Sequence, residues 1–257
     1  MGGFLARLAA AIALLFAHPA LAQENSDITA AARSVVRIAL VETHDGEQYL
    51  LGHASGVAVA PNLIVTNAHV VAPLEMADDI GMMIVPAEGS RRYVGRLVAV
   101  DPRADLALIR LESGAIPPAT IYTGPLDENA RVAAIGYPGS VDLAENLSAR
   151  DRVTPMDAVR TFGQISGGRS RRDVQTLLHT AAMAQGNSGG PLVDACGRIV
   201  GVNSFGSISS GSDAEFAFAI AARELVPFLR ANGVRPRTIG LACESMAERD
   251  RREALRR

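Results

Sequence analysis

The chain has 257 residues, of which 48% are hydrophobic and 20% are charged. This composition is that of a folded globular protein and excludes a disordered chain. The formal net charge of −2 gives no general attraction for nucleic acid or for an anionic membrane surface. Nucleic acid is therefore not an expected partner.

The first 22 residues contain the parts of a secretory signal peptide in the usual order. Arg7 precedes an apolar run, LAAAIALLFA, that is too short to stay as a membrane span. Residues 20–22, ALA, then place small side chains two apart, as signal peptidase requires. A buried N-terminal helix is the alternative. We expect cleavage of residues 1–22, export to the periplasm or the medium, and no stable membrane span afterwards.

Short runs of β-prone residues follow, most of them four to nine residues long and separated by Gly, Pro, Asn or Asp. Many short strands with frequent turns predict an all-β sandwich or barrel. An α/β protein needs helical patterns of 10–15 residues between strands, and the middle of the chain offers none clearly. Residues 141–160 interrupt the strand rhythm and predict a long surface loop.

One helix is expected late in the chain, in AARELVPFLRANG. Leu225, Phe228 and Leu229 share one face of it, and Gly233 is suited to its C-terminal cap. Pro227 must then lie in or near the first turn to be tolerated.

Ser188 lies in a glycine-rich stretch, QGNSGGPL, that is suited to a bent backbone around one hydroxyl group. A serine hydroxyl is a weak nucleophile unless a base takes its proton, and that base is most often histidine. The histidine needs a carboxylate that fixes its tautomer. The alternative is a flexible turn between two strands.

His69 is the best candidate base, because it follows an apolar strand in IVTNAHVV and has small neighbours. His53 and His179 lie in or beside strand-like runs, where a structural role is the better interpretation. Asp105 is the best candidate carboxylate, at the start of the alternating strand DLALIRL. Asp101 is the rival, although its DPR context indicates a turn.

The three segments TNAHVV, DLALIRL and GNSGGPL together resemble the catalytic blocks of trypsin-like serine proteases, nearest to the bacterial HtrA/Deg branch. The order His, Asp, Ser and the separations of 36 and 83 residues fit that family. The resemblance covers roughly residues 33–232 and implies two six-stranded antiparallel β-barrels with a C-terminal helix. His and Asp would lie in a lobe at 23–125, Ser in a lobe at 126–232, and a charged tail would follow at 233–257.

The resemblance implies that Ser188 is the nucleophile, His69 the general base and acid, and Asp105 the orienting carboxylate. The N–H groups of Gly186 and Ser188 would form the oxyanion hole, and Gly189 and Gly190 would leave space for the substrate carbonyl. The implied function is a secreted or periplasmic serine-type endopeptidase that acts on protein or peptide substrates through an acyl-enzyme, without metal or cofactor.

The residues leave two other functions to be weighed against this one. One is a catalytically silent peptide-binding protein of the same fold. The presence of all three triad residues counts against it. The other is an α/β-hydrolase, which would show G-x-S-x-G and the order Ser, Asp, His.

Two departures from relatives of this fold are informative. Digestive trypsins have an Asp directly before the serine, which pairs with a newly cut N-terminus, whereas this chain has the neutral Asn187. The oxyanion loop must then be held in another way. The 25 residues after 232 are too few for the PDZ domain that HtrA-like proteins usually carry.

The resemblance also implies the walls of the substrate pocket. No acid lies in TAAMAQG, and an apolar pocket cannot repay the desolvation of Arg or Lys, so small or medium apolar P1 residues are expected. Asp213 and Glu215 are nearby in sequence and could oppose this. The substrate-binding residues would be Ala182, Met183, Asn203, Ser204, Phe205 and Phe218.

Cys196 and Cys243 are the two cysteines of the chain, and neither has the spacing of a zinc site. In an exported protein two cysteines more often pair than stay free. Cys196 lies in a predicted hairpin turn, and the fold implied by the resemblance packs the C-terminal helix against the second barrel. A disulfide that staples the tail to that barrel is expected.

Overall fold

The computed structural model describes residues 27–171, 173–206, 216–243 and 254. The predicted signal peptide, most of the charged tail, and both Asp213 and Glu215 lie outside the described residues. Among the described residues, no helix has the length and apolar character needed to cross a membrane.

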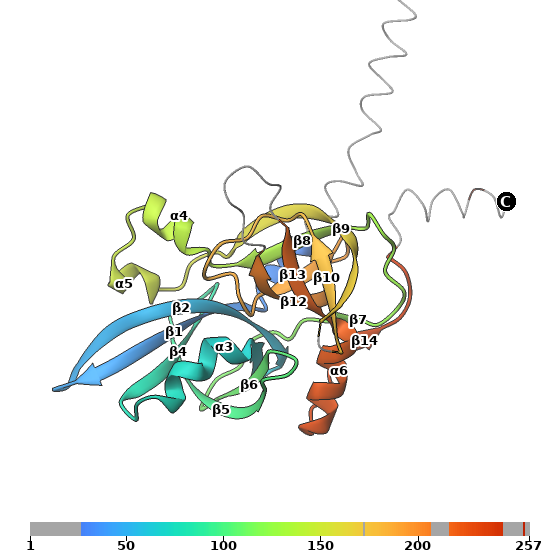
Figure 1. The fold of residues 1–257 in the computed structure, drawn as a ribbon. Coiled ribbons are helices and arrows are strands. Elements are labelled where there is room, and N and C mark those ends of the chain that lie inside the picture. The colour runs from blue at the N-terminus through green and yellow to red at the C-terminus, as the bar shows by residue number, and fades with distance from the viewer. Residues whose placement is uncertain (1–26, 172, 207–215, 244–253, 255–257) are drawn as a thin grey trace, which may run out of the picture.

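The first half of the chain forms a closed barrel of six antiparallel strands, coloured blue to green in Figure 1. Alternating or continuous apolar residues face its interior, where Ile38, Ile64, Ile84 and Ile109 are fully buried. In barrel order the strands are β1 (Val35–His44), β2 (Glu47–Ala60), β3 (Leu63–Thr66), β6 (Leu106–Leu111), β5 (Tyr93–Asp101) and β4 (Ile80–Pro86).

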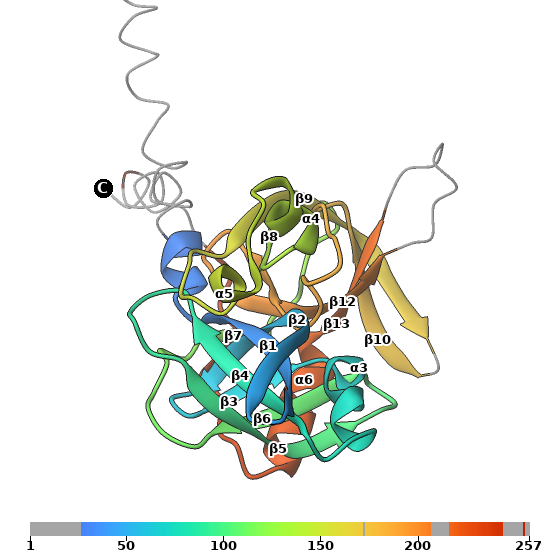
Figure 2. The ribbon, with the colours of Figure 1, turned by 90° about the vertical axis from the view of Figure 1, so that its left-hand side faces the viewer.

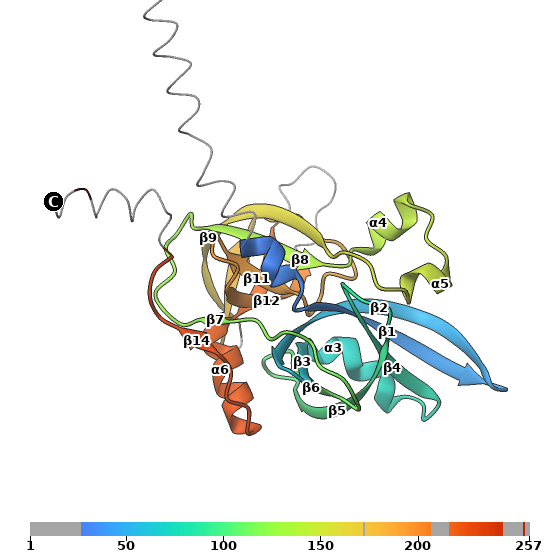
Figure 3. The ribbon, with the colours of Figure 1, turned by 180° about the vertical axis from the view of Figure 1, so that it is seen from behind.

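The second half forms another ring of six antiparallel strands, which the pairing of β11 with β12 closes. Two short strands, β7 (Ile121–Tyr122) and β14 (Thr238–Ile239), extend it by parallel pairing beyond β12. Figure 3 shows them on the flank next to α6. The expected two-barrel fold is therefore confirmed. The ring strands are β11 (Pro191–Asp194), β8 (Arg131–Gly136), β9 (Val159–Arg171), β10 (Val174–His179), β13 (Ala217–Ala221) and β12 (Ile199–Gly206).

A separate apolar core joins the two barrels. Val57 and Leu108 of the first barrel pack in one cluster with Val202 and Ile220 of the second and Leu225 of the C-terminal helix. All five side chains are 3% exposed or less. Because this core is close-packed, it fixes the position of one barrel relative to the other.

The C-terminal helix α6 (Ala222–Ala231) buries Leu225, Phe228 and Leu229 as expected. Gly233 follows its end with φ +75°, and the N–H of Val234 donates to the Leu229 carbonyl at 2.9 Å, which closes a Schellman motif. These parts of the prediction are confirmed.

The expectation that Pro227 lies in the first turn of α6 is wrong. The helix begins directly after β13, so Pro227 is in its interior. Pro227 is exposed, and the carbonyl of Arg223 that lacks its N–H partner belongs to an exposed residue as well. Water can solvate that carbonyl, while the buried face of the helix supplies the packing that holds it.

The expected loop at 141–160 is also only partly right. It contains two short helices, α4 (Gly139–Ala144) and α5 (Ala149–Arg152), which lie above the β1–β2 hairpin in Figures 1 and 3. Ser148 and Asp151 form a reciprocal capping box that starts α5. Asp142 in α4 is 3% exposed, so this segment is anchored in the protein rather than solvated.

His179, at the end of β10, gives a testable dependence of stability on pH. The side chain is fully buried, and burial lowers the pKa of His179 to about 4. The unfolded chain takes up this proton near pH 6.5, so stability is complete above that pH and is lost as the pH falls toward 4. We expect a loss on the order of 3 kcal/mol in the free energy of unfolding over this window.

Urea unfolding at intervals between pH 7 and pH 4 measures this loss. The His179→Gln variant should show a flatter pH profile than the wild type. The His44→Gln variant, which changes an exposed histidine, should keep the wild-type slope. An unchanged slope in His179→Gln would exclude His179 as the titrating group.

Candidate active site

His69 and Asp105 lie on neighbouring connections at one end of the first barrel. The strand β3 ends at Thr66, and Asn67 then begins the short helix α3 (Ala68–Val71) that carries His69. Asp105 occupies the turn before β6 with φ +52°, a left-handed conformation that Asp tolerates. The side-chain amide of Asn67 donates to the Asp105 carbonyl at 2.9 Å and ties the two connections together.

The imidazole of His69 is held by the Asp105 carboxylate. Nδ1 lies 3.0 Å from both Oδ1 and Oδ2, and the backbone N–H of His69 donates to Oδ1 at 3.1 Å. An ionised carboxylate only accepts hydrogen bonds, so the proton is on Nδ1. The lone pair of Nε2 is then available, as a general base requires.

Ser204 adds a hydrogen bond that the sequence analysis missed. Its hydroxyl group donates to Oδ2 of Asp105 at 2.5 Å, although Ser204 was expected in the wall of the substrate pocket. Burial alone would raise the pKa of Asp105, but the hydrogen bonds from His69 and Ser204 outweigh it and lower that pKa. Asp105 therefore stays ionised beside the imidazole.

Ser188 lies in the connection between β10 and β11 of the second barrel. Its hydroxyl group donates to the Ser204 carbonyl at 2.9 Å, and the structure shows no hydrogen bond between Ser188 and His69. The backbone carbonyl of Ser188 accepts the N–H of Ser55 at 2.9 Å. Ser204 thus contacts both Asp105 and Ser188, and it links the two halves of the site.

Gly186 allows a close approach of the expected oxyanion loop, residues 185–188, to the segment after β8. Its φ is +100°, and a Cβ atom there would lie 2.2 Å from the Tyr137 carbonyl oxygen and 2.9 Å from Nε2 of His53. Among the described residues, the N–H groups of Gly186 and Ser188 have no hydrogen-bond partner. Both donors are available to an incoming acceptor.

Gly189, expected to leave space for a substrate carbonyl, also lies directly against the first barrel. A Cβ atom at Gly189 would lie 2.1 Å from Oγ1 of Thr66 and 2.2 Å from the Ser55 carbonyl oxygen. Atoms of the first barrel therefore occupy the place that a side chain at Gly189 would take. This glycine lets the Ser188 loop of one barrel pack directly on the other.

The expected pocket residues do not all present their side chains to one space. Asn203 is fully buried and donates to the Pro191 carbonyl at 3.0 Å inside the second barrel. Ala182 is exposed, Met183 packs on the core of the second barrel, and Phe218 on β13 pairs with Phe205 in the strand ladder. A cavity of about 520 Å³ beside α6 and β10 contains none of the predicted site residues.

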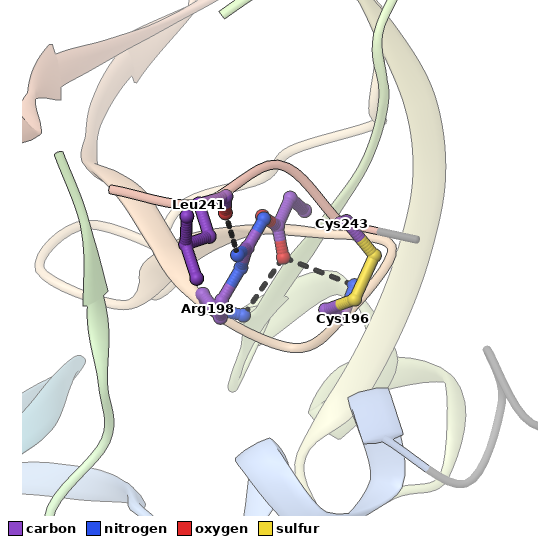
Figure 4. Close-up of a disulfide and its surroundings, with 5 residues drawn as sticks. Cys196, Arg198, Leu241 and Cys243 are labelled. Atoms are coloured by element: carbon purple, nitrogen blue, oxygen red, sulfur yellow. Dashed lines mark hydrogen bonds and ion pairs between the residues drawn. A yellow bond between two sulfur atoms is a disulfide. The ribbon is translucent and has the colours of Figure 1, made fainter. Parts of the chain in front are cut away.

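Cys196 and Cys243 form the expected disulfide, with their Cα atoms 5.9 Å apart (Figure 4). Beside it, Arg198 pairs with Asp194 and donates to the Leu241 carbonyl at 2.6 Å. The turn between β11 and β12 is therefore bonded covalently and through hydrogen bonds to the segment that follows β14.

Comparisons with known proteins give matches to one family of peptidase domains. The family model of the trypsin-like peptidase domain matches residues 54–202, more than half of the chain. A serine protease of Mycobacterium tuberculosis (strain H37Rv) is 32% identical over 174 residues, which are 66% of this chain and 40% of the relative. A probable periplasmic serine endoprotease, DegP-like, of Ectopseudomonas mendocina is 35% identical over 167 residues, 63% of this chain and 31% of the relative.

The magnetosome formation protease MamE of Magnetospirillum gryphiswaldense is 32% identical over 167 residues, 63% of this chain and 20% of the relative. The chain thus spans less than half the length of these curated relatives. The family match includes His69, Asp105 and Ser188. The chain belongs to the family of trypsin-like peptidase domains.

Proposed function

We propose that the protein is an exported serine endopeptidase that hydrolyses peptide bonds through Ser188, His69 and Asp105. The observation that carries this is the imidazole of His69, which contacts an ionised carboxylate through Nδ1 and leaves Nε2 free. Two of the relatives are named a serine protease and a probable DegP-like periplasmic serine endoprotease, and these names support the proposed activity and export.

The first chemical step is attack by the Ser188 hydroxyl on the substrate carbonyl carbon. Nε2 of His69 takes the hydroxyl proton as the C–O bond forms, and Asp105 stabilises the resulting imidazolium without taking the proton itself. The N–H groups of Gly186 and Ser188 bind the oxyanion. The imidazolium then protonates the leaving amine, and water, activated by the same imidazole, hydrolyses the acyl-enzyme.

Attack requires the Ser188 hydroxyl to turn from the Ser204 carbonyl to His69. In enzymes without substrate, catalytic hydrogen bonds are often long or poorly aligned and tighten only in the complex. A backbone N–H of the substrate that binds the Ser204 carbonyl would replace the hydroxyl there. Substrate binding would in this way release the nucleophile toward its base.

Covalent labelling tests the proposal. A peptidyl diphenyl phosphonate should label the wild-type protein at Ser188, located by peptide mapping, and should not label Ser188→Ala. A catalytically silent peptide-binding protein of the same fold would bind the peptide portion but remain unlabelled. That result would favour the alternative function.

Substrate preference is a second test. We expect kcat/KM for Val, Ala or Leu at P1 to exceed that for Arg or Lys by more than about tenfold, because the stretch before Ser188 has no acid to pair with a basic side chain. A fluorogenic peptide series that differs only at P1 measures the ratio. Preference for Arg would contradict it, and loss of that preference in Asp213→Asn or Glu215→Gln would identify the counter-charge.

A further inference from the structure

A buried ion pair lies behind the oxyanion loop. Arg37 on β1 is 1% exposed and Asp142 on α4 is 3% exposed, and Nη2 of the guanidinium donates to Oδ1 of the carboxylate at 2.8 Å. The cost of removing two charges from water offsets much of their attraction, so a buried pair of this kind adds little to the stability of the fold. The contacts of the pair indicate instead that it positions neighbouring groups.

The guanidinium of Arg37 also contacts the rest of the α4–α5 segment. Nη1 donates to the Arg152 carbonyl at 3.0 Å, and the group lies over the ring of Tyr137 with 4.7 Å to its centroid. Arg37 therefore fixes the start and the end of this segment on the first barrel.

The helix α4 contacts the oxyanion loop through its first residue. The N–H of Gly139 donates to the Gln185 carbonyl at 2.7 Å. In a planar trans peptide the C=O of one residue and the N–H of the next point in opposite directions. The bond from Gly139 to the Gln185 carbonyl therefore fixes the direction of the Gly186 N–H, which is one of the two proposed oxyanion donors.

The following peptide is held from the first barrel. The hydroxyl of Ser55 donates to the Gly186 carbonyl at 2.6 Å and accepts the Tyr137 N–H at 2.9 Å. Nε2 of His53 lies 2.9 Å from the Tyr137 carbonyl and 3.4 Å from Oδ2 of Asp142. Burial, with the nearby charge of Arg37, lowers the pKa of His53, so the neutral ring donates its Nε2 proton.

We infer that the Arg37–Asp142 pair, through α4, positions the Gly186 N–H for the oxyanion hole, with Asp142 as the positioning residue. This inference rests on the proposed function. Asn187 cannot supply an ion pair within the oxyanion loop itself. The chain instead carries an ion pair outside the loop and connects it to the loop through the Gly139 N–H.

The test compares two double variants that each replace a buried ion pair by apolar residues, a change that folded proteins often tolerate. Arg37→Met/Asp142→Leu removes the pair behind the oxyanion loop. Arg198→Met/Asp194→Leu removes a pair of similar burial, with side chains 10% and 8% exposed, at the disulfide turn. Either variant can alter stability, but only the first should change catalysis.

For Arg37→Met/Asp142→Leu we expect kcat to fall by about 10- to 100-fold with KM changed less than about threefold, because the oxyanion acts in the transition state and not in substrate binding. The affinity for a peptide boronate, whose tetrahedral adduct occupies the oxyanion hole, should fall by a similar factor. The measurements are made well below the midpoint of thermal unfolding of each variant. The control variant should keep both values.

The single variant Asp142→Asn keeps the size and one acceptor oxygen, so it should lose less kcat than Asp142→Ala. Equal kcat and boronate affinity in wild type and Arg37→Met/Asp142→Leu would overturn the inference, as would equal losses in the control variant. A wild-type protein that neither cleaves peptides nor reacts with a phosphonate would instead contradict the proposed function.

Discussion

Replacement of Ser188 or of His69 by alanine is expected to lower kcat by about 10⁶-fold, and the double replacement should lower it little further. The reason is that the hydroxyl group and the imidazole act in one proton transfer, so either loss removes the whole step. His69 can serve this step because its Nδ1 donates its proton to Oδ2 of Asp105, with 3.0 Å between the two atoms. Steady-state hydrolysis of a peptide anilide measures the effect, with residual activity compared with buffer alone.

The matched control for this series is His44→Ala, which removes an exposed histidine at the end of β1 and should keep wild-type kcat. Losses in the Ser188→Ala/His69→Ala double variant that multiply those of the single variants would show that the two residues act independently. The triad assignment would then be wrong.

Loss of the disulfide should be the largest effect on stability. It closes a loop of 47 residues, for which the chain-entropy model gives about 4 kcal/mol at most. This is a large share of the roughly 5–15 kcal/mol that keeps a domain folded. Urea unfolding of Cys196→Ser/Cys243→Ser should show the loss, while kcat at low temperature should change little because the bond joins β11–β12 to the tail.

Dithiothreitol should not lower the stability of this double variant further, because the variant has no disulfide to reduce. This measurement controls for other effects of the reductant. Mass spectrometry of the unreduced protein checks the bond directly. Two thiols that are both alkylated without denaturant would contradict the disulfide and the expected loss.

Much of the site could be predicted because the motifs around His69, Asp105 and Ser188 are local. Each consists of a strand end or a glycine-rich turn whose residues are adjacent in sequence. The barrels could be expected from short β-prone runs, but strand order could not, since ladders such as β3 with β6 join residues about 45 apart. Those pairings depend on closure of the whole ring.

The features that were missed depend on contacts between distant residues. Ser204 is 99 residues from Asp105, and Asp142 is 105 residues from Arg37. In sequence Asp142 is an acid within a polar stretch, and only the tertiary fold removes it from water. Pro227 was misplaced for a related reason, since burial of one face of α6 overrides the local penalty of proline.

The proposed catalytic residues are divided between the two barrels, so the proposed reaction depends on the relative alignment that the shared apolar core maintains. His69 and Asp105 belong to one ring, whereas Ser188 and Ser204 belong to the other. Hydrogen bonds weaken steeply as their geometry departs from the ideal, so a slip of one ring against the other by about 1 Å would stop the reaction while each ring stayed folded. In the proposed mechanism the rate of peptide cleavage therefore depends on how the two barrels are aligned. A ligand that binds between the barrels and shifts this alignment would inhibit cleavage without occupying the active site.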